Sequence, residues 1–316
     1  MKRVLFLAAT IVGPSIGAAC CGVGGGGLPV AFTGQTNLVV WDAVHHVEHF
    51  VRDARFSTQS KDLGFIAPTP GRPTLSETDA EIFRILEALG PRKPPMRAMK
   101  SKGIDTAATA GTVEVLEVKD VAGYRASVLK ANDPEALTDW LGKNGYPAPR
   151  FLPKWAAPYI ERGWTFTAFK VKGGVGAATG PIRMSFSTDR PFNPYSVPEE
   201  NGRGGRVPLR LYYLSSGEEV PKIGGKEAWR TAEWSADVGR ATSDRIARRL
   251  RLETGAMPPN ARVSSYLDGE FGRSGLDDLY FVPEPSSNRA TLLGGAGIVA
   301  LGIVLLRRRQ ARPTAS

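Results

Sequence analysis

Cysteine is nearly absent from this chain of 316 residues, because Cys20 and Cys21 are the only two. A bond between adjacent cysteines would be strained, since their Cα atoms lie only about 3.8 Å apart across a trans peptide. No disulfide can therefore join distant parts of a folded domain. The fold must be stabilised by a packed core, for which the chain has 6 tryptophans and 13 phenylalanines.

Histidine is equally scarce, and its 3 copies all lie in the window VHHVEHF, residues 44–50. Ser-His-Asp and Cys-His catalytic arrangements need a histidine, so these schemes are confined to that window. A histidine-free scheme that uses paired carboxylates on a glycoside stays open. Asp and Glu together number 31, but no spacing singles out a pair.

A large basic excess is also missing from most of the chain. The sequence has 41 Lys and Arg, and 41 less the six at the two ends leaves 35, against 31 Asp and Glu. We therefore expect no nucleic-acid partner. One basic cluster remains at residues 245–251, RIARRLR, where Ile246 and Leu250 fit the buried side of a helix with a solvated arginine face. The alternative is contact with an anionic surface, either phospholipid or acidic polysaccharide.

The N-terminus carries the pattern of an export signal. Residues 1–19, MKRVLFLAATIVGPSIGAA, have a basic start, an apolar run and small residues at the end, which predicts a secretory signal peptide. Cleavage after Ala19 would leave Cys20 as the mature N-terminus. Residues 17–20, GAAC, partly resemble a bacterial lipobox but lack the large aliphatic residue three positions before the cysteine. Lipidation of Cys20 is therefore the less favoured alternative.

The C-terminus carries the pattern of a membrane anchor. Residues 290–306, ATLLGGAGIVALGIVLL, are uncharged and apolar, at the short limit for spanning about 30 Å of hydrocarbon. Four arginines follow within residues 307–312, and cationic side chains stay on the cytoplasmic side. We predict one transmembrane helix with a basic cytoplasmic tail, residues 307–316. The ectodomain would then lie in the periplasm or outside the cell, anchored in the inner membrane.

The motif V-P-E-P, formed by Val282, Pro283, Glu284 and Pro285, stands just before this segment. With the apolar helix and the arginines it resembles the PEP-CTERM sorting signal that exosortases handle in certain Gram-negative bacteria. The resemblance implies processing by signal peptidase and then by an exosortase, which would pass the ectodomain to the cell surface. The alternative, which the composition supports equally well, is a Pro/Ser linker over residues 283–289 before a permanent anchor.

Between the two ends, the sequence predicts a glycine-rich, flexible segment at residues 20–36 and an ectodomain at residues 37–282, with a mobile loop at residues 92–111. Alternating strands such as WTFTAFKV are mixed with helices such as NDPEALTDWLGKNGY, whose Leu137, Trp140 and Leu141 are predicted to face the core. Residues 227–252 predict a further helical stretch. Because there is no βαβ rhythm, we expect an α+β fold with mixed, largely antiparallel sheets and a few packed helices.

Five segments occur in a characteristic order: KDLGFIAPTPGRP, NDPEALTDWLGKNGY, GWTFTAFKV, GPIRMSFSTDRP and LDDLYFVP. Together they resemble the bacterial domain-of-unknown-function 2330 family over nearly the whole ectodomain. The resemblance implies no activity, ligand or site residue. It does imply strands around Val39 and Val51 with a turn near residues 42–45. The adjacent Cys20 and Cys21 depart from the family, which usually places its second cysteine a few residues further on.

The histidine window can also be read as H-x-x-E-H, an arrangement of two zinc ligands around a catalytic glutamate. Its candidate residues are His45, Glu48 and His49. That chemistry needs a helix, whereas the periodicity here fits a helix or a strand. In a strand the two histidines would lie about 13 Å apart, too far to share one zinc ion. We therefore disfavour a metal site and expect no cofactor.

Two classes of function remain. We favour an exported, membrane-anchored envelope protein with a binding or structural role, whose partner is an envelope protein or a polysaccharide. The alternative is an envelope hydrolase that uses carboxylates, of the glycosidase type. Two carboxyl groups about 5–10 Å apart in an aromatic-lined cleft would favour the hydrolase. An exposed apolar patch without such a pair would favour the binding module.

Overall fold

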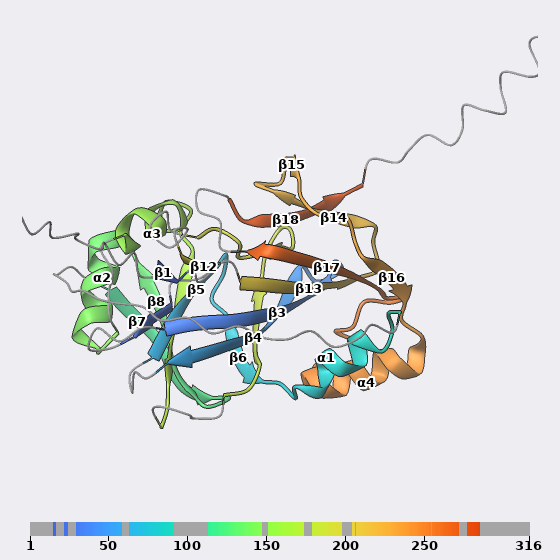
Figure 1. Ribbon diagram of the computed structural model, residues 1–316, viewed down its shortest axis with the longest axis horizontal. Helices are drawn as coiled ribbons and strands as arrows, with labels where there is room; N and C mark the ends of the chain where they lie inside the picture. The colour runs from blue at the N-terminus through green and yellow to red at the C-terminus, as the bar shows by residue number, and fades with distance from the viewer. Residues whose placement is uncertain are drawn as a thin grey trace, which may run out of the picture. The chain divides into compact units, whose positions relative to one another are not determined.

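The computed structural model describes residues 15–16, 22–24, 30–58, 63–91, 113–146, 151–173, 179–197, 204–205, 207–253, 255–271 and 277–284. The chain forms two units, residues 1–282 and 283–316. The fold described below belongs to the first unit, and of the second only residues 283–284 are described (Figure 1).

Strands outnumber helices in the described part of the chain. The strands are β1 (Ser15–Ile16), β2 (Gly22–Gly24), β3 (Val30–Asp42), β4 (Val47–Thr58), β5 (Leu63–Thr69), β6 (Thr74–Glu77), β7 (Val113–Val121), β8 (Tyr124–Ala131), β9 (Thr165–Val171), β10 (Ile182–Ser187), β11 (Phe192–Asn193), β12 (Gly204–Gly205), β13 (Val207–Ser215), β14 (Glu219–Ile223), β15 (Glu227–Ala228), β16 (Trp234–Asp237), β17 (Arg262–Phe271) and β18 (Leu279–Pro283). The helices are α1 (Glu81–Glu87), α2 (Pro134–Lys143), α3 (Leu152–Glu161) and α4 (Arg240–Leu250).

The strands form three main sheets. The largest has the order β16-β17-β13-β3-β4-β10-β6, a second has the order β2-β5-β9-β8-β7, and a third has the order β11-β18-β14-β15. Within the largest sheet β13 and β3 run parallel, whereas its other pairings are antiparallel. The expected α+β class with largely antiparallel sheets is therefore confirmed.

Helices α1 and α4 cover one face of the seven-stranded sheet, and Figure 1 shows them side by side. Alternation along the strands sends Leu38, Val40 and Val51 to this face. There they meet Ile82 and Leu86 of α1 in a buried cluster that also contains Ile246 and Leu250 of α4. The expectation that Ile246 and Leu250 form the buried side of this helix is confirmed.

The opposite face of the seven-stranded sheet lies in a larger core that is shared with the other two sheets. Val39, Trp41 and Phe50 point into it. Its contact with β18 includes Tyr213 and Phe281, whose rings stack with centroids 3.8 Å apart. The five-stranded sheet contributes Phe65, which stacks on Phe169. One apolar core thus ties the three sheets together.

Helices α2 and α3 pack on the five-stranded sheet. Local signals in the sequence define where α2 begins and ends. Asp133 caps α2 by accepting a hydrogen bond from the amide of Ala136, and Pro134 occupies the first turn. Past the end of α2, Gly145 has a φ of 73°, which favours glycine. Helix α3 packs Trp155 and Tyr159 onto Phe166 of β9. These helices cover part of the sheet and leave part of its outer face open.

Several boundaries differ from those expected. Strand β3 begins at Val30, and residues 22–24 pair with β5, both inside the segment predicted to be flexible. The helix expected over residues 227–252 is confined to α4, because residues 227–228 and 234–237 are strands. Residues 15–16, within the predicted signal peptide, pair with β12.

The predicted membrane span, residues 290–306, and the predicted loop, residues 92–111, lie outside the described residues. Of the helices that the structure describes, none is long and apolar enough to cross a membrane.

Candidate functional site

The histidine window forms the end of a β-hairpin. Residues 43–46 make the turn between β3 and β4, as the family resemblance implied. Asp42 holds this turn, since its Oδ1 accepts hydrogen bonds from the amides of Val44 and His45 and its Oδ2 lies 2.6 Å from His45 Nδ1. His46 has a φ of 53°, a left-handed conformation that is uncommon outside glycine. The window is therefore a strand–turn–strand segment and not a helix.

The three candidate metal ligands are not brought together. His45 lies in the exposed turn, while Glu48 and His49 are successive residues of β4 and point to opposite faces of the sheet. Glu48 is buried, and its Oε2 accepts a hydrogen bond from the amide of Phe192. His49 Nδ1 lies 2.8 Å from Ser185 Oγ on β10. Across the part of the chain that the structure describes, no three His, Cys, Asp or Glu side chains could hold a metal ion.

Burial shifts the pKa values of Glu48 and His49 in opposite directions. It raises the pKa of Glu48 well above its usual value, which the hydrogen bond from Phe192 opposes only in part. It lowers the pKa of His49 to about 4, and the charge of Arg183 acts in the same direction. Both groups are therefore held in their neutral forms at a pH between about 4 and the raised Glu48 value. They are core residues whose polar atoms are largely enclosed.

A chain of buried polar side chains, which the sequence did not reveal, crosses the larger core. Arg52 donates to Gln35 Oε1, Gln35 Nε2 donates to Asn37 Oδ1, and Asn37 Nδ2 donates to Asn193 Oδ1. The guanidinium of Arg52 also lies 4.4 Å from the ring centroid of Phe65. These bonds join β3 and β4 to β11 and compensate for the desolvation of the groups. The hydrogen-bonded chain therefore helps to hold these three strands together.

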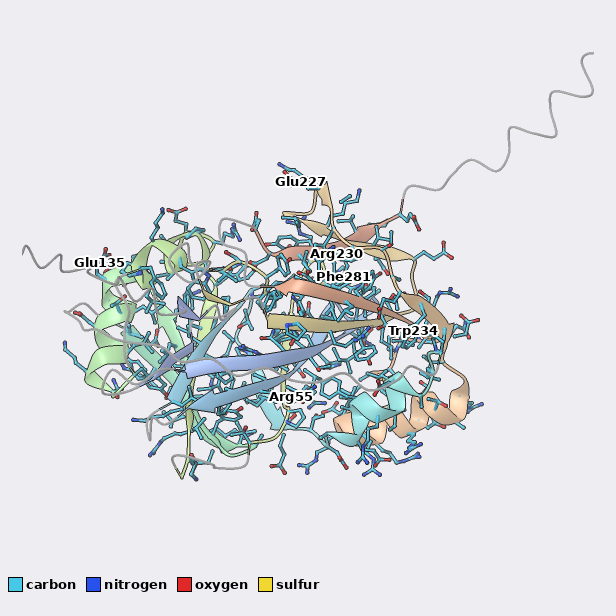
Figure 2. The ribbon with its side chains drawn as sticks, in the orientation of Figure 1. Arg55, Glu135, Glu227, Arg230, Trp234 and Phe281 are labelled. Atoms are coloured by element: carbon cyan, nitrogen blue, oxygen red, sulfur yellow. The ribbon has the colours of Figure 1, made fainter. Side chains whose placement is uncertain are left out.

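A second polar group surrounds Asp268, a buried residue of β17. Tyr195 donates its hydroxyl to Asp268 Oδ2 at 2.6 Å, and Arg230, which Figure 2 labels, donates to Oδ1 at 2.8 Å. Burial raises the pKa of Tyr195. Both carboxylate oxygens of Asp268 are therefore engaged in hydrogen bonds within the fold.

The open part of the five-stranded sheet holds a groove. Its volume is about 530 Å³, and strands β7, β8 and β9 and the end of α2 form its walls. The lining residues are Val115, Val118, Arg125, Ser127, Trp140, Asn144, Tyr146, Lys170, Val171 and Lys172. We refer to this site as the β7–α2 groove. Its volume lies within the range of about 300–1,000 Å³ that is typical of small-ligand sites.

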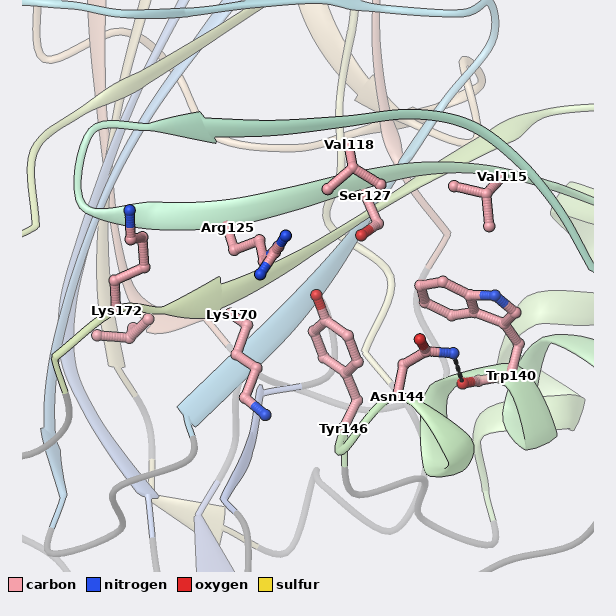
Figure 3. A pocket seen from close by; sticks show the side chains of 10 residues that line it. Val115, Val118, Arg125, Ser127, Trp140, Asn144, Tyr146, Lys170 and Lys172 are labelled. Atoms are coloured by element: carbon pink, nitrogen blue, oxygen red, sulfur yellow. Dashed lines mark hydrogen bonds between the residues drawn. The ribbon is translucent and has the colours of Figure 1, made fainter.

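The β7–α2 groove has two chemically different ends. Figure 3 shows Arg125, Lys170 and Lys172 spread over one side, with the ends of the two lysines pointing in opposite directions, and Trp140 with Val115 on the other side. Tyr146 lies between them, and its hydroxyl donates to the carbonyl of Ala168. Cations and rings are therefore presented to the same space.

The sheet and α2 fix these side chains in place. Arg125 and Lys170 are opposite each other on β8 and β9, so their side chains share a face. Trp140 and Tyr146 stack with ring centroids 6.1 Å apart. Gly64 makes room for this packing, because a Cβ there would come within 2.9 Å of the Tyr146 ring. Burial raises the pKa of Tyr146, so the phenol stays protonated at neutral pH.

The sequence predicted the helix but not the groove. Leu137 and Leu141 are buried as expected, whereas Trp140, also expected to face the core, is only partly buried and lines the groove. Val115 and Val118 both belong to strand β7, and their side chains are 42% and 51% exposed. Two exposed valines opposite a partly exposed tryptophan would have indicated the groove. The sequence alone does not show this arrangement, because it does not show that β7 faces α2.

The arginine cluster on α4 is paired within the fold. Three of its arginines form ion pairs with acidic residues of β6 and α1 and the loop between them. The pairs are Arg245–Glu81, Arg249–Asp79, Arg249–Glu81 and Arg251–Glu77. Exposed pairs of this kind contribute little stability each. They reduce the positive charge that the helix offers to an anionic surface.

The motif proposed for sorting begins inside the fold. Val282 and Pro283 belong to β18, and Glu284 follows it directly. Pro285, like Cys20, lies outside the described residues. Strand β18 is therefore complete at Pro283.

Comparison with known proteins gives one finding. A family model described as "Uncharacterized protein conserved in bacteria (DUF2330)" matches residues 14–242. No curated protein and no solved structure matches the chain.

Proposed function

The chain belongs to the DUF2330 family of bacterial proteins, and we propose that it is an exported, single-pass cell-envelope protein whose ectodomain acts as a binding module. The signal pattern at residues 1–19 and the apolar segment at residues 290–306 with its arginines support export and anchoring. The ligand surface in this proposal is the β7–α2 groove.

One observation carries the binding role: the groove combines exposed valines, two stacked rings and three cations in one concave site. Val115 and Val118 are two of the three large apolar side chains that are exposed among the described residues, and both line this one site. No Asp or Glu is among the residues that line the groove. A carboxylate-dependent hydrolase would need such a pair facing its substrate, so the lining supports the binding role over the alternative.

The proposal leaves two alternatives for the C-terminal segment: cleavage or retention. An exosortase would cut beyond β18 and pass the ectodomain to the cell surface, or the segment after Pro283 would remain a linker to a permanent inner-membrane anchor. Mass spectrometry of the mature protein from its native envelope separates them, because it reports both ends of the chain. A start at Cys20 supports export, and a lipid mass on Cys20 would identify a lipoprotein. A full-length chain in the cytosol would refute the proposal.

Occupancy of the groove can be tested in the envelope itself. Val118→Cys places a thiol in the groove, and Val44→Cys places one on the hairpin turn, where Val44 is 73% exposed. We expect a maleimide to label position 118 more slowly in intact envelopes than in the purified chain, as read by peptide mass spectrometry. Position 44 should label equally in both. Equal labelling at position 118 would show that the groove has no occupant there.

A further inference from the structure

We propose that the ligand of the β7–α2 groove is an anionic saccharide segment that carries carboxylate groups, of the uronate type. This inference rests on the proposed binding role and assigns its ligand chemistry. In it, the carboxylate lies among Arg125, Lys170 and Lys172, and the apolar face of a sugar ring packs against Trp140.

The cationic end calls for an anion. Lys172 is paired with Asp120 at 2.6 Å, and Asp120 lies opposite Arg125 on the neighbouring strand. Even if this one carboxylate is counted against the three cations, the end keeps a positive balance. Arg125 offers a planar fork that matches a carboxylate, and Lys170 adds a point charge on the same face.

The aromatic end calls for a ligand with an apolar face. Trp140 and Tyr146 form a stacked pair, and Val115 and Val118 stand on the facing strand. Aromatic rings supply a large apolar area with a fixed geometry. A pyranose ring has a face of C–H groups and an edge of hydroxyls, so it can pack on the rings while its edge reaches polar atoms. Ser127 and Asn144 place such atoms in the lining.

The distance between the two kinds of group matters as much as their presence. Lys170 Nζ lies 6.0 Å from the centroid of Tyr146 and donates to the carbonyl of Gly145. The cation is thus close to the inner ring of the stacked pair, which suits a uronate chain, because its carboxylates are attached directly to the sugar rings. An acidic peptide carries its charges on flexible stems and has no flat C–H face.

The size of the groove argues against the other macromolecular partners. Its volume of about 530 Å³ suits a few sugar rings. A protein partner normally buries about 800 Å² on each side of an interface, and binding to an anionic membrane depends on a broad basic or apolar surface. We therefore commit to the saccharide and treat the other partners as outcomes of the test.

Calorimetry with the full chain in non-ionic detergent tests the inference. The probe is a short oligogalacturonate, and the matched control is the same oligomer with its carboxyls methyl-esterified, which removes the charge and keeps the sugar. We expect binding of the acidic oligomer that weakens as salt rises and that is about tenfold or more tighter than binding of the ester. Equal affinity for both forms, or no binding of the acid, would overturn the inference.

Variants tie the binding to the groove. Arg125→Gln and Lys170→Gln should each weaken binding about tenfold, which corresponds to about 1.4 kcal/mol. Arg248→Gln on α4, an exposed arginine outside the groove, is the matched control and should leave affinity unchanged. Trp140→Ala should lose affinity because it removes the aromatic ring. Trp140→Phe keeps a ring and should retain most of the parent's affinity. Thermal melts of each variant show whether it is folded, and folded groove variants that bind normally would refute the assignment.

Two further probes decide between sources of negative charge. Polyglutamate tests for an acidic peptide, and phosphatidylglycerol vesicles test for a lipid surface. Binding of either one that is tighter than the oligogalacturonate and lost in Arg125→Gln would overturn the saccharide assignment but leave the binding module standing. Cytosolic full-length protein would instead refute the proposed function, whatever the purified chain binds.

Discussion

His49 is a buried ring whose protonation the fold opposes. Its pKa is lowered to about 4 from an ordinary value near 6.5, so between these values the unfolded chain binds more protons than the folded one. The free energy of unfolding should therefore rise with pH from about 4 to 6.5 and fall as the pH drops through that window. His49→Gln should remove up to about 3 kcal/mol of this pH dependence, measured by urea unfolding at several pH values.

Ser185→Ala separates the charge of His49 from its hydrogen bond. This variant deletes the hydroxyl that contacts His49 Nδ1 but leaves the titrating ring in place. It should lower stability at all pH values and preserve the slope. A His49→Gln protein whose slope equals that of the parent would contradict the assignment.

Glu48 should act in the opposite direction. Because burial raises its pKa, the folded state binds more protons than the unfolded state above the ordinary value near 4.5. Its contribution is therefore favourable at low pH and is lost as the pH rises through the raised value, with a slope of at most about 1.4 kcal/mol per pH unit. Glu48→Gln should flatten this loss and make the protein more stable than the parent at alkaline pH. Unfolding curves at pH 5 and 9 provide the check.

At the scale of elements, α4 depends on one buried arginine from β10. Arg183 Nη1 donates to the carbonyls of Leu250 and Arg251, where the helix ends with carbonyls that have no partner within it. Arg183→Met should therefore cost about 1.5–3 kcal/mol of the free energy of unfolding. Amide exchange in residues 240–250 should become faster.

Arg248→Met is the matched change for Arg183→Met. It removes an arginine from the exposed side of α4 itself and should alter stability by less than about 0.5 kcal/mol. If the two substitutions cost the same, the hydrogen bonds to the helix end are not what stabilises α4.

Elements with strong local signals were predictable. The helix predicted in NDPEALTDWLGKNGY is α2, and it has a capping aspartate, a proline in its first turn and a closing glycine. By contrast, the short helix α1 starts at Glu81, shortly after the four-residue strand β6 ends at Glu77. The sequence pattern of a four-residue strand is too short to show where the strand ends and the following helix begins. Pairing with β10, which is distant in sequence, decides it.

The groove escaped prediction for a related reason. Trp140 lies on the apolar side of α2, and burial was the natural expectation from periodicity. Whether that side is covered depends on how far β7 and β8 extend beyond the helix, which is a tertiary property. Residue types therefore predicted the elements of the site, while the open space between them came only from the assembled sheet.

At the scale of the whole molecule, the two ends of the chain should decide where it resides. A chain truncated before residue 290 should move from the membrane pellet to the soluble exported fraction, because it loses the predicted span while it keeps every described element of the ectodomain. Cell fractionation with immunoblotting measures this. Persistence of the truncated chain in the membrane would point to another attachment, of which lipidation at Cys20 is the first to examine.

The central position of β3 has a consequence for how the domain would fold if the chain is exported as proposed. This strand lies between β4, which follows it directly, and β13, which pairs with it in parallel from residues 209–214. A chain that crosses a membrane from its N-terminus presents the first hairpin long before its other neighbour emerges. Contacts so distant in sequence form slowly. In the proposed export the hairpin would therefore wait with an open edge, and we expect a periplasmic chaperone that shields this edge to raise the yield of the native protein.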